Sequence, residues 1–235
     1  MKSIQIVSPH IDDAFLSLGG CIVKWIEKGF KVTVYNIFTI SNWVAPDSLS
    51  GIEKRLTTDE VTRLRKREEM LVQKKARFRY ECWDFLDFPL RKRFSKNDDI
   101  RMANEIAMKL RPVVNEGDLI FFPSAVGNHN DHILINKIGR SFSREHSNIA
   151  FFEDMPYTSW AETNFQTLYK KNLKDKMPIC EKINSEIKMK ILKLYSSQIT
   201  AKFLSSIESY SYNPIDNTNY ERFWVSKAYQ KNKKR

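Results

Sequence analysis

Short segments rich in β-branched residues alternate with helical segments along this chain, and this alternation limits its fold more than any other feature. Residues 4–7 and 31–38 are strand-like, and the stretch from Phe15 to Trp25 between them carries apolar side chains at helical spacing. Two strands joined by a helix pair in parallel, because a parallel pair needs a long crossover connection. Further strands are predicted at residues 80–88, 118–123 and 149–153. We therefore predict an α/β sandwich with a mostly parallel sheet.

Helical patterns fill most of the intervals between these strands. The predicted helices cover residues 57–76, 97–110, 133–142 and 181–195, with a shorter one to about Ser209. Pro112 is expected to lie beyond the end of the second helix, because proline cannot donate a helical hydrogen bond. Three segments without a clean period are interpreted as loops, the second of them with some helix: residues 40–56, 155–180 and 213–219.

The length and composition favour one globular unit. The chain has 235 residues, so we expect a single domain over 1–235, with 227–235 as a solvated basic tail. No apolar run reaches the roughly 20 residues of a membrane-spanning helix, and no secretory signal pattern is present, which predicts a cytoplasmic protein. The net charge of +11 raises nucleic acid or an anionic membrane as a partner. The basic residues are dispersed and no nucleic-acid-binding motif accompanies them, so we do not expect a nucleic-acid ligand.

Histidines and aspartates gather in two loops that follow predicted strands. The first loop contains His10, Asp12 and Asp13, and the second contains His129 and His132. Loops at the carboxyl ends of parallel strands meet at one edge of a sheet, where ligands bind. A catalytic zinc ion needs three protein ligands and leaves one position for water. His10, Asp13 and His132 would supply such a set.

The residues beside these ligands have the chemistry of an acid–base pair. Zinc lowers the pKa of a bound water molecule towards 7, and Asp12 could accept the proton of that water as general base. His129 could, as an imidazolium, stabilise an oxyanion and protonate a leaving amine. Two histidines and a carboxylate also suit non-haem iron, so Fe²⁺ or another divalent metal stays open. Either loop alone has a plainer interpretation, in which its polar residues cap a helix or bond within a turn.

Several segments, in the same order, resemble the PIG-L/LmbE-like zinc-dependent N-acetylglucosaminyl de-N-acetylases. These segments are residues 9–13 with Gly19-Gly20, Arg65 with Glu68, and residues 127–132, 153–157, 188–198 and 220–223. The match spans nearly the whole chain. It implies a three-layer sandwich with a Rossmann-like sheet. It also implies a hydrolase that removes an N-acyl group, most commonly acetyl, from an amino sugar or its conjugate.

The resemblance implies the same zinc ligands as above and the same roles for Asp12 and His129. It further implies that Asp131 orients His129 or its neighbour, and that Arg65 reaches sugar hydroxyls or a phosphate. The alternative for Arg65 is an ion pair with Glu68 or Glu69 one turn along a helix surface.

The chain also departs from the family pattern. Ile11 and Asn130 replace a proline in each histidine motif, and Leu90 stands where an acid commonly follows the proline after the third strand. With the basic run 91–93, the last change hints at a different or anionic substrate.

Two alternatives to the sugar deacetylase remain open. One is an amidase that acts on a non-sugar amide, and the other is a non-catalytic binding protein with the same fold.

Overall fold

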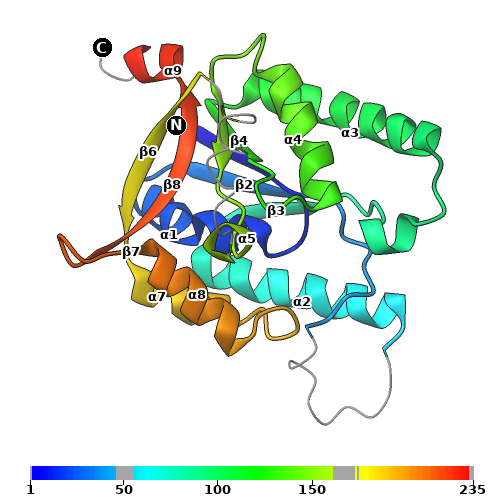
Figure 1. The fold of residues 1–235 in the computed structure, drawn as a ribbon, viewed down its shortest axis with the longest axis horizontal. Helices are drawn as coiled ribbons and strands as arrows, with labels where there is room; N and C mark the ends of the chain where they lie inside the picture. Colours follow the sequence, from blue (N-terminus) through cyan, green and yellow to red (C-terminus); the bar gives the residue numbers. More distant parts are fainter. Residues whose placement is uncertain (1, 46–55, 161–172, 174, 233–235) are drawn as a thin grey trace.

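The computed structural model describes residues 2–45, 56–160, 173 and 175–232, and a mixed sheet lies at its centre (Figure 1). The strands are β1 (Ser3–Ser8), β2 (Lys31–Asn36), β3 (Arg79–Cys82), β4 (Leu119–Pro123), β5 (Ile149–Phe152), β6 (Lys176–Ile183), β7 (Tyr212–Asn213) and β8 (Thr218–Ser226). Within the described ranges they form an eight-stranded sheet in the order β3-β2-β1-β4-β5-β8-β6, with β7 paired to β8. The first five strands in this order pair in parallel, whereas β8 is antiparallel to both β5 and β6.

Helices cover both faces of the sheet, which confirms the predicted α/β sandwich (Figure 1). One face is covered by α1 (Asp13–Glu27), α2 (Thr58–Ala76), α7 (Ser185–Leu192) and α8 (Ala201–Ser211), and the other by α3 (Lys96–Glu116) and α4 (Asn130–Phe142). Strand β4 contributes to both cores: Phe121 packs on the α1 side, and Ile120 and Phe122 pack on the α3 side. Apolar residues on both faces are what a central parallel strand requires.

The strand order reverses beside β1, and this reversal creates the place for a site. From β1 the chain proceeds through α1 to β2 and then β3, and after α3 it returns to the opposite side of β1 as β4. The loops after β1 and β4 therefore leave the same edge of the sheet and diverge above it. Ligands bind at such a switch point in open α/β sheets.

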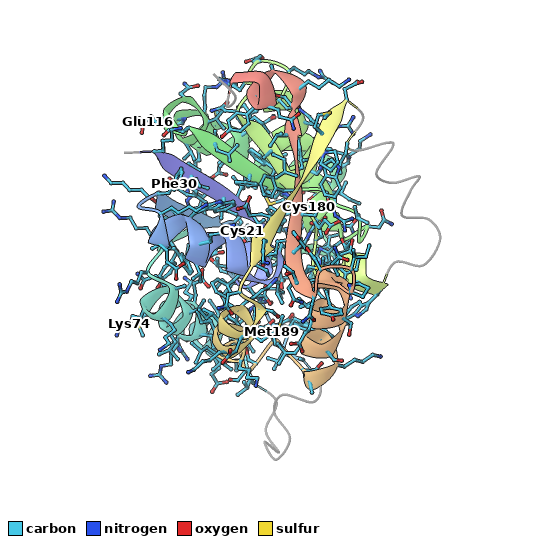
Figure 2. All side chains as sticks on the ribbon, turned by 90° about the vertical axis from the view of Figure 1, so that its left-hand side faces the viewer. Cys21, Phe30, Lys74, Glu116, Cys180 and Met189 are labelled. Carbon is cyan, nitrogen blue, oxygen red and sulfur yellow. The ribbon has the colours of Figure 1, made fainter. Side chains whose placement is uncertain are left out.

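Helix α1 is kinked in its middle, and Glu221, about 200 residues later in the sequence, accepts hydrogen bonds from the backbone N–H groups after the kink. Leu18 has non-helical dihedral angles (φ −128°, ψ 15°). The Glu221 carboxylate on β8 accepts hydrogen bonds from the backbone N–H groups of Gly20 and Cys21, and it also pairs with Lys188 at 2.7 Å. A Cβ at Gly20 would lie 2.6 Å from Ile183, so the close approach of α1 to the end of β6 requires glycine. Figure 2 shows α1 beside β6 and β8, with α7 below.

The sequence-based boundaries before residue 125 need two corrections. Strand β3 ends at Cys82 rather than continuing to residue 88, because Asp84 takes a left-handed conformation (φ 58°) that interrupts the pairing with β2. Residues Phe88–Arg91 form a short 3₁₀ helix, η1. Helix α3 begins after a Ser95 N-cap and continues through Pro112 to Glu116. The buried side chains of its last turns outweigh the one backbone hydrogen bond that proline removes.

The C-terminal part of the chain contains more strand than we expected. Residues 176–180, interpreted as loop, begin β6, and the expected helix 181–195 is only α7. The expected loop 213–219 is a turn between β7 and β8. The short helices α5 (Tyr157–Trp160) and α9 (Lys227–Asn232) complete the described elements.

Residues Lys227–Asn232, which we expected to belong to a solvated tail, form α9. Tyr229 of α9 packs against the core on the α1 side, and residues 233–235 lie outside the described part of the chain. None of the helices within the described ranges combines the length and hydropathy needed to cross a bilayer.

Candidate metal centre

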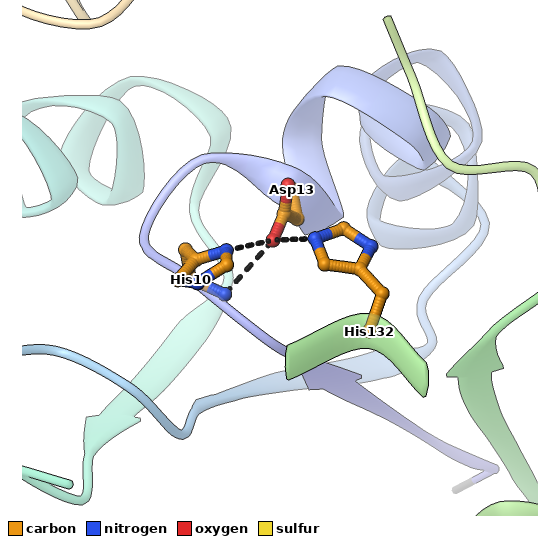
Figure 3. Close-up of side chains that lie close together, drawn as sticks. All are labelled: His10, Asp13 and His132. Atoms are coloured by element: carbon orange, nitrogen blue, oxygen red, sulfur yellow. Dashed lines mark hydrogen bonds and ion pairs between the residues drawn. The ribbon is translucent and has the colours of Figure 1, made fainter. Parts of the chain in front are cut away.

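Three side chains from the two histidine loops converge on one point (Figure 3). Asp13 is the first residue of α1, His10 lies in the turn between β1 and α1, and His132 lies in the first turn of α4. The Asp13 Oδ2 atom is 3.0 Å from His10 Nδ1 and 3.1 Å from His132 Nε2. The three potential ligand atoms all lie within 4.8 Å of one another. The structure thus brings together the three ligands that the sequence suggested.

The charges of this trio suit a cation. Burial lowers the pKa of His10, but hydrogen bonds to Asp13 and Asp131 outweigh it and raise the pKa to about 9. Burial likewise disfavours charge on His132, yet the neighbouring Asp13 and Asp154 hold its pKa above the ordinary value. Burial would raise the pKa of Asp13, but the two histidines hold it well below its usual range. The surroundings of these three side chains therefore stabilise positive charge between them.

The outer nitrogen of each histidine is held by a buried aspartate. His10 Nε2 lies 2.9 Å from Asp131 Oδ2, and His132 Nδ1 lies 2.7 Å from Asp154 Oδ1. These bonds turn His10 Nδ1 and His132 Nε2 towards Asp13, and His132 Nε2 is buried without a hydrogen-bond partner. Two imidazole nitrogens, one carboxylate and carboxylate-oriented rings are the donor set that zinc takes in catalytic sites. The residues present therefore fit a zinc ion.

A second trio is less suited to a metal. His10, His129 and Asp131 also place ligand atoms within 4.8 Å of one another. There, however, Asp131 already accepts hydrogen bonds from Arg91 Nη2 and from the backbone N–H of Phe88. Both its carboxylate oxygens are engaged, so Asp131 serves better as the group that orients His10.

The structure places the side chains of Asp131 and Arg91 against each other behind His10. The Asp131 side chain holds His10 rather than His129, which it contacts only through its backbone N–H, 3.3 Å from His129 Nδ1. Arg91 is 4% exposed and donates to Asp131, to Asp99 and to the Leu86 carbonyl oxygen. The start of the basic run 91–93 is therefore a structural cation and not an anion-binding surface.

Asp12 has the position of a general base beside the trio. Its backbone is left-handed (φ 118°), a conformation that a non-glycine residue adopts at a cost and that functional sites often hold. Burial raises the pKa of Asp12 to about 7, although Arg65, with Nη2 at 3.6 Å from Asp12 Oδ1, acts in the opposite direction. A carboxyl group of this pKa can take and return a proton near neutral pH.

Arg65 is buried at the site and is not on a helix surface. It donates to the Ile11 carbonyl oxygen at 3.1 Å as well as facing Asp12, so the expected alternative, an ion pair with the following glutamates, is replaced by these contacts. Glu68 instead accepts hydrogen bonds from the backbone and hydroxyl of Ser197, and Glu69 accepts from Tyr195. The two glutamates thereby fix the turn that carries Gln198 to the pocket.

His129 is a neutral donor in this arrangement. Burial, together with the charges of His10 and His132, lowers the pKa of His129 to about 4, whereas the expected role called for an imidazolium. Because His129 Nδ1 accepts the backbone N–H of Asp131, its proton lies on Nε2. The Nε2–H group is free to donate to an oxygen in the pocket.

These residues form the floor of a cavity of about 350 Å³. Its walls include the side chains of Trp43, Asp87, Tyr157 and Trp160. The expected loop 40–56 contributes Trp43 to this wall, while its residues 46–55 lie outside the described ranges. Its volume falls within the range of small-molecule sites and would admit a sugar-sized group beside the trio.

Sequence reasoning gave no role to Asp154 or Asp87, and it placed Arg91 only in a basic run that hinted at an anionic substrate. Asp154 follows β5, the neighbour of β4, so the rule that identified the histidine loops applies to it as well. Arg91 and Asp87 carried no such signal, because the end of β3 was placed six residues too late.

Known proteins resemble this chain in sequence and in fold. Residues 5–143, more than half of the chain, match the family described as GlcNAc-PI de-N-acetylase, or PIG-L. The 2'-N-acetylparomamine deacetylase of Streptomyces fradiae is 29% identical over 163 residues, which cover 65% of this chain and 56% of that protein. The chain thus matches little more than half the length of this relative.

Two solved structures share the fold. The zinc-inhibited form of teicoplanin deacetylase Orf2 superposes with a TM-score of 0.74 at 19% identity, covering 95% of this chain and 97% of the other. The N,N'-diacetylchitobiose deacetylase from Pyrococcus horikoshii gives 0.63 at 17% identity, covering 94% and 82%.

Proposed function

The chain belongs to the PIG-L family of GlcNAc-PI de-N-acetylases, and we propose that it is a zinc-dependent N-deacetylase. Its reaction is the hydrolysis of an N-acyl group, most directly N-acetyl, on an amino sugar or amino-sugar conjugate. The observation that carries the proposal is the convergence of His10, Asp13 and His132, with both rings held by buried aspartates. The names of two relatives, an N-acetylparomamine and a diacetylchitobiose deacetylase, support the substrate class.

The reaction breaks an amide C–N bond and consumes one water molecule. Zinc bound by His10, Asp13 and His132 would supply Lewis acidity, which polarises a carbonyl oxygen and acidifies water near neutral pH. Asp12 accepts a proton from the attacking water and returns it to the leaving nitrogen, so that acetate and a free amine form.

The remaining residues position the reacting groups. The Nε2–H of His129 donates to the oxygen on which negative charge develops. Asp131 and Asp154 keep the two histidine rings turned to the metal. Arg65 holds the turn that carries Asp12 through the Ile11 carbonyl oxygen. Arg65 also lines the cavity, where its guanidinium group would reach substrate hydroxyls or a phosphate.

Metal content and acetate release test this proposal together. The protein is stripped with chelator, reloaded with zinc or Fe²⁺, and assayed on N-acetylated sugars in free, nucleotide-linked and lipid-linked form. We expect zinc to restore acetate release, and Asp12→Asn to lower kcat about 10²- to 10⁴-fold while binding the metal as before. His132→Ala should lose the metal.

His146→Ala is the matched control, because His146 is the one histidine that lies outside the site. It should retain both metal and activity. Hydrolysis of non-sugar amides alone would favour the amidase instead. A purified protein that neither binds zinc or iron nor releases acetate would point to a binding protein with this fold.

A further inference from the structure

One carboxylate in the pocket wall is left without a partner. Asp87 is 3% exposed and lines the cavity above the trio. Its Oδ1 atom is buried and accepts no hydrogen bond from any described residue. The backbone around it is firmly held, because Asp87 N–H donates to the Ile40 carbonyl oxygen and the Asp87 carbonyl oxygen accepts from Leu90 N–H. The side chain is therefore kept in the wall by its main chain and by nothing that balances its charge.

The cations near Asp87 are already committed to other acids. Arg65 faces Asp12 at 3.6 Å. Arg91, four residues after Asp87, pairs with Asp131 and with Asp99. Asp13 belongs to the metal trio. Of the four charged side chains that line the cavity, Asp12 and Arg65 offset each other, and Asp87 remains as the uncompensated negative charge.

A buried carboxylate without a partner is costly, and a protein retains such a group where a ligand supplies what is missing. Hydroxyl groups would satisfy its hydrogen-bonding capacity but not its charge. An ammonium group does both, and the water-poor wall strengthens that attraction. The chemistry that matches Asp87 is therefore a cationic amine.

We propose that Asp87 binds a free ammonium group on the substrate, so that the substrate is an N-acylated amino sugar that carries at least one further, unacylated amine. This inference rests on the proposed deacetylase function, and it names the substrate class for the same pocket. Of the basic run 91–93, which hinted at an anionic substrate, Arg91 is turned inward to Asp131.

The test uses substrates that differ in one group. N-acetylglucosamine is compared with congeners in which the 3-, 4- or 6-hydroxyl is replaced by an amine, with the zinc-loaded protein. For at least one congener, we expect kcat/KM to exceed that of N-acetylglucosamine about 10- to 100-fold, the range of a hydrogen bond between charged groups. Asp87→Asn should remove most of this preference through KM, so that the ratio of kcat/KM for the amine congener to kcat/KM for N-acetylglucosamine falls towards one.

Asp84→Asn is the matched control. Asp84 lies three residues earlier, but its carboxylate is half exposed and already paired with Lys66. It removes the same charge from the protein without touching the cavity lining, so the preference should survive. Asp87→Asn should melt no lower than the native protein, because it removes an uncompensated buried charge.

Two results would overturn the inference. One is a native protein that shows no preference for any amine congener. The other is an Asp87→Asn variant that keeps the preference or loses neutral and cationic substrates equally, which would make Asp87 a hydroxyl acceptor.

Binding measurements distinguish a failure of this inference from a failure of the proposed deacetylase function. If no substrate is hydrolysed, the proposed function fails, and calorimetry with the unacetylated diamino sugars and glucosamine decides about Asp87. Tighter binding of a diamine that Asp87→Asn abolishes supports the inference, and equal binding contradicts it.

Discussion

The two histidines proposed as metal ligands are held by aspartates in contrasting surroundings. Asp131, behind His10, lies against the guanidinium of Arg91 and the backbone N–H of Phe88, both from η1. Asp154, behind His132, accepts instead from the Ser124 hydroxyl at 2.7 Å and the Val126 N–H at 3.0 Å. We call Asp131 with Arg91 and Phe88 the charged arm. Asp154 with Ser124 and Val126 is the neutral arm.

The contrast shows what each ligand depends on. The charged arm is anchored in the segment that follows β3, the same segment that places Asp87 in the pocket wall. The neutral arm is anchored directly after the ends of the central strands β4 and β5. The orientation of His10 is therefore tied to the pocket wall, and that of His132 is tied to the sheet. Substitutions in each arm can separate these two dependences.

Breaking the charged arm should have the largest effect. Arg91→Met leaves Asp131 buried beside His10 without its guanidinium, and losing one partner of a buried pair costs about 3–5 kcal/mol. Urea unfolding of the zinc-loaded protein should show this loss in the free energy of unfolding.

The double variant Arg91→Met/Asp131→Asn should recover part of it, because the unpaired charge is gone. A loss below about 1 kcal/mol for Arg91→Met would mean that the arm is not charge-dependent.

Neutralising the acid of the neutral arm should have an intermediate effect. Asp154→Asn keeps the shape of the side chain but removes the charge that polarises His132, and such outer groups contribute about 10- to 100-fold to metal affinity. Competition with a chromophoric chelator measures this affinity. Unchanged zinc affinity would show that the sheet alone orients His132.

The smallest effects should come from the outermost contacts. Ser124→Ala removes one hydrogen bond to Asp154 and should cost about 1 kcal/mol in unfolding free energy.

Asp99→Asn removes a partner of Arg91, a residue of the charged arm. The Asp99 side chain is 45% exposed, so the change in unfolding free energy should stay below about 1 kcal/mol. If Asp99→Asn lowered the unfolding free energy more than Ser124→Ala, Arg91 would depend on Asp99 rather than on Asp131.

The fold and the metal trio followed from the sequence because both depend on local patterns. β-Branched segments separated by helices gave the parallel half of the sheet, and that topology alone brings the loop of His10 to the loop of His132. The antiparallel edge was missed because its residues carry no such pattern. Pro178 and three charged residues interrupt β6, and its partner β8 lies about forty residues further on.

The supporting residues were missed for a different reason. Whether Arg91 faces solvent or Asp131 depends on where β3 ends, and a left-handed Asp84 decides that. Whether Arg65 pairs along its own helix or across to Asp12 depends on the distance between α2 and the first loop. The spacing of residues along the sequence determines neither the orientation of Arg91 nor the partner of Arg65.

The Glu221 contact with the break in α1 has a consequence for the order in which the protein is made. All three ligand residues leave the ribosome long before Glu221 does, yet the N–H groups of Gly20 and Cys21 obtain their acceptor only from that residue. A nascent chain that ends before β8 contains all three proposed ligands, but α1, which begins with Asp13, still lacks the acceptor for its break. The helix that follows the loop of His10 thus receives its last hydrogen-bond acceptor from a residue 201 positions after Gly20.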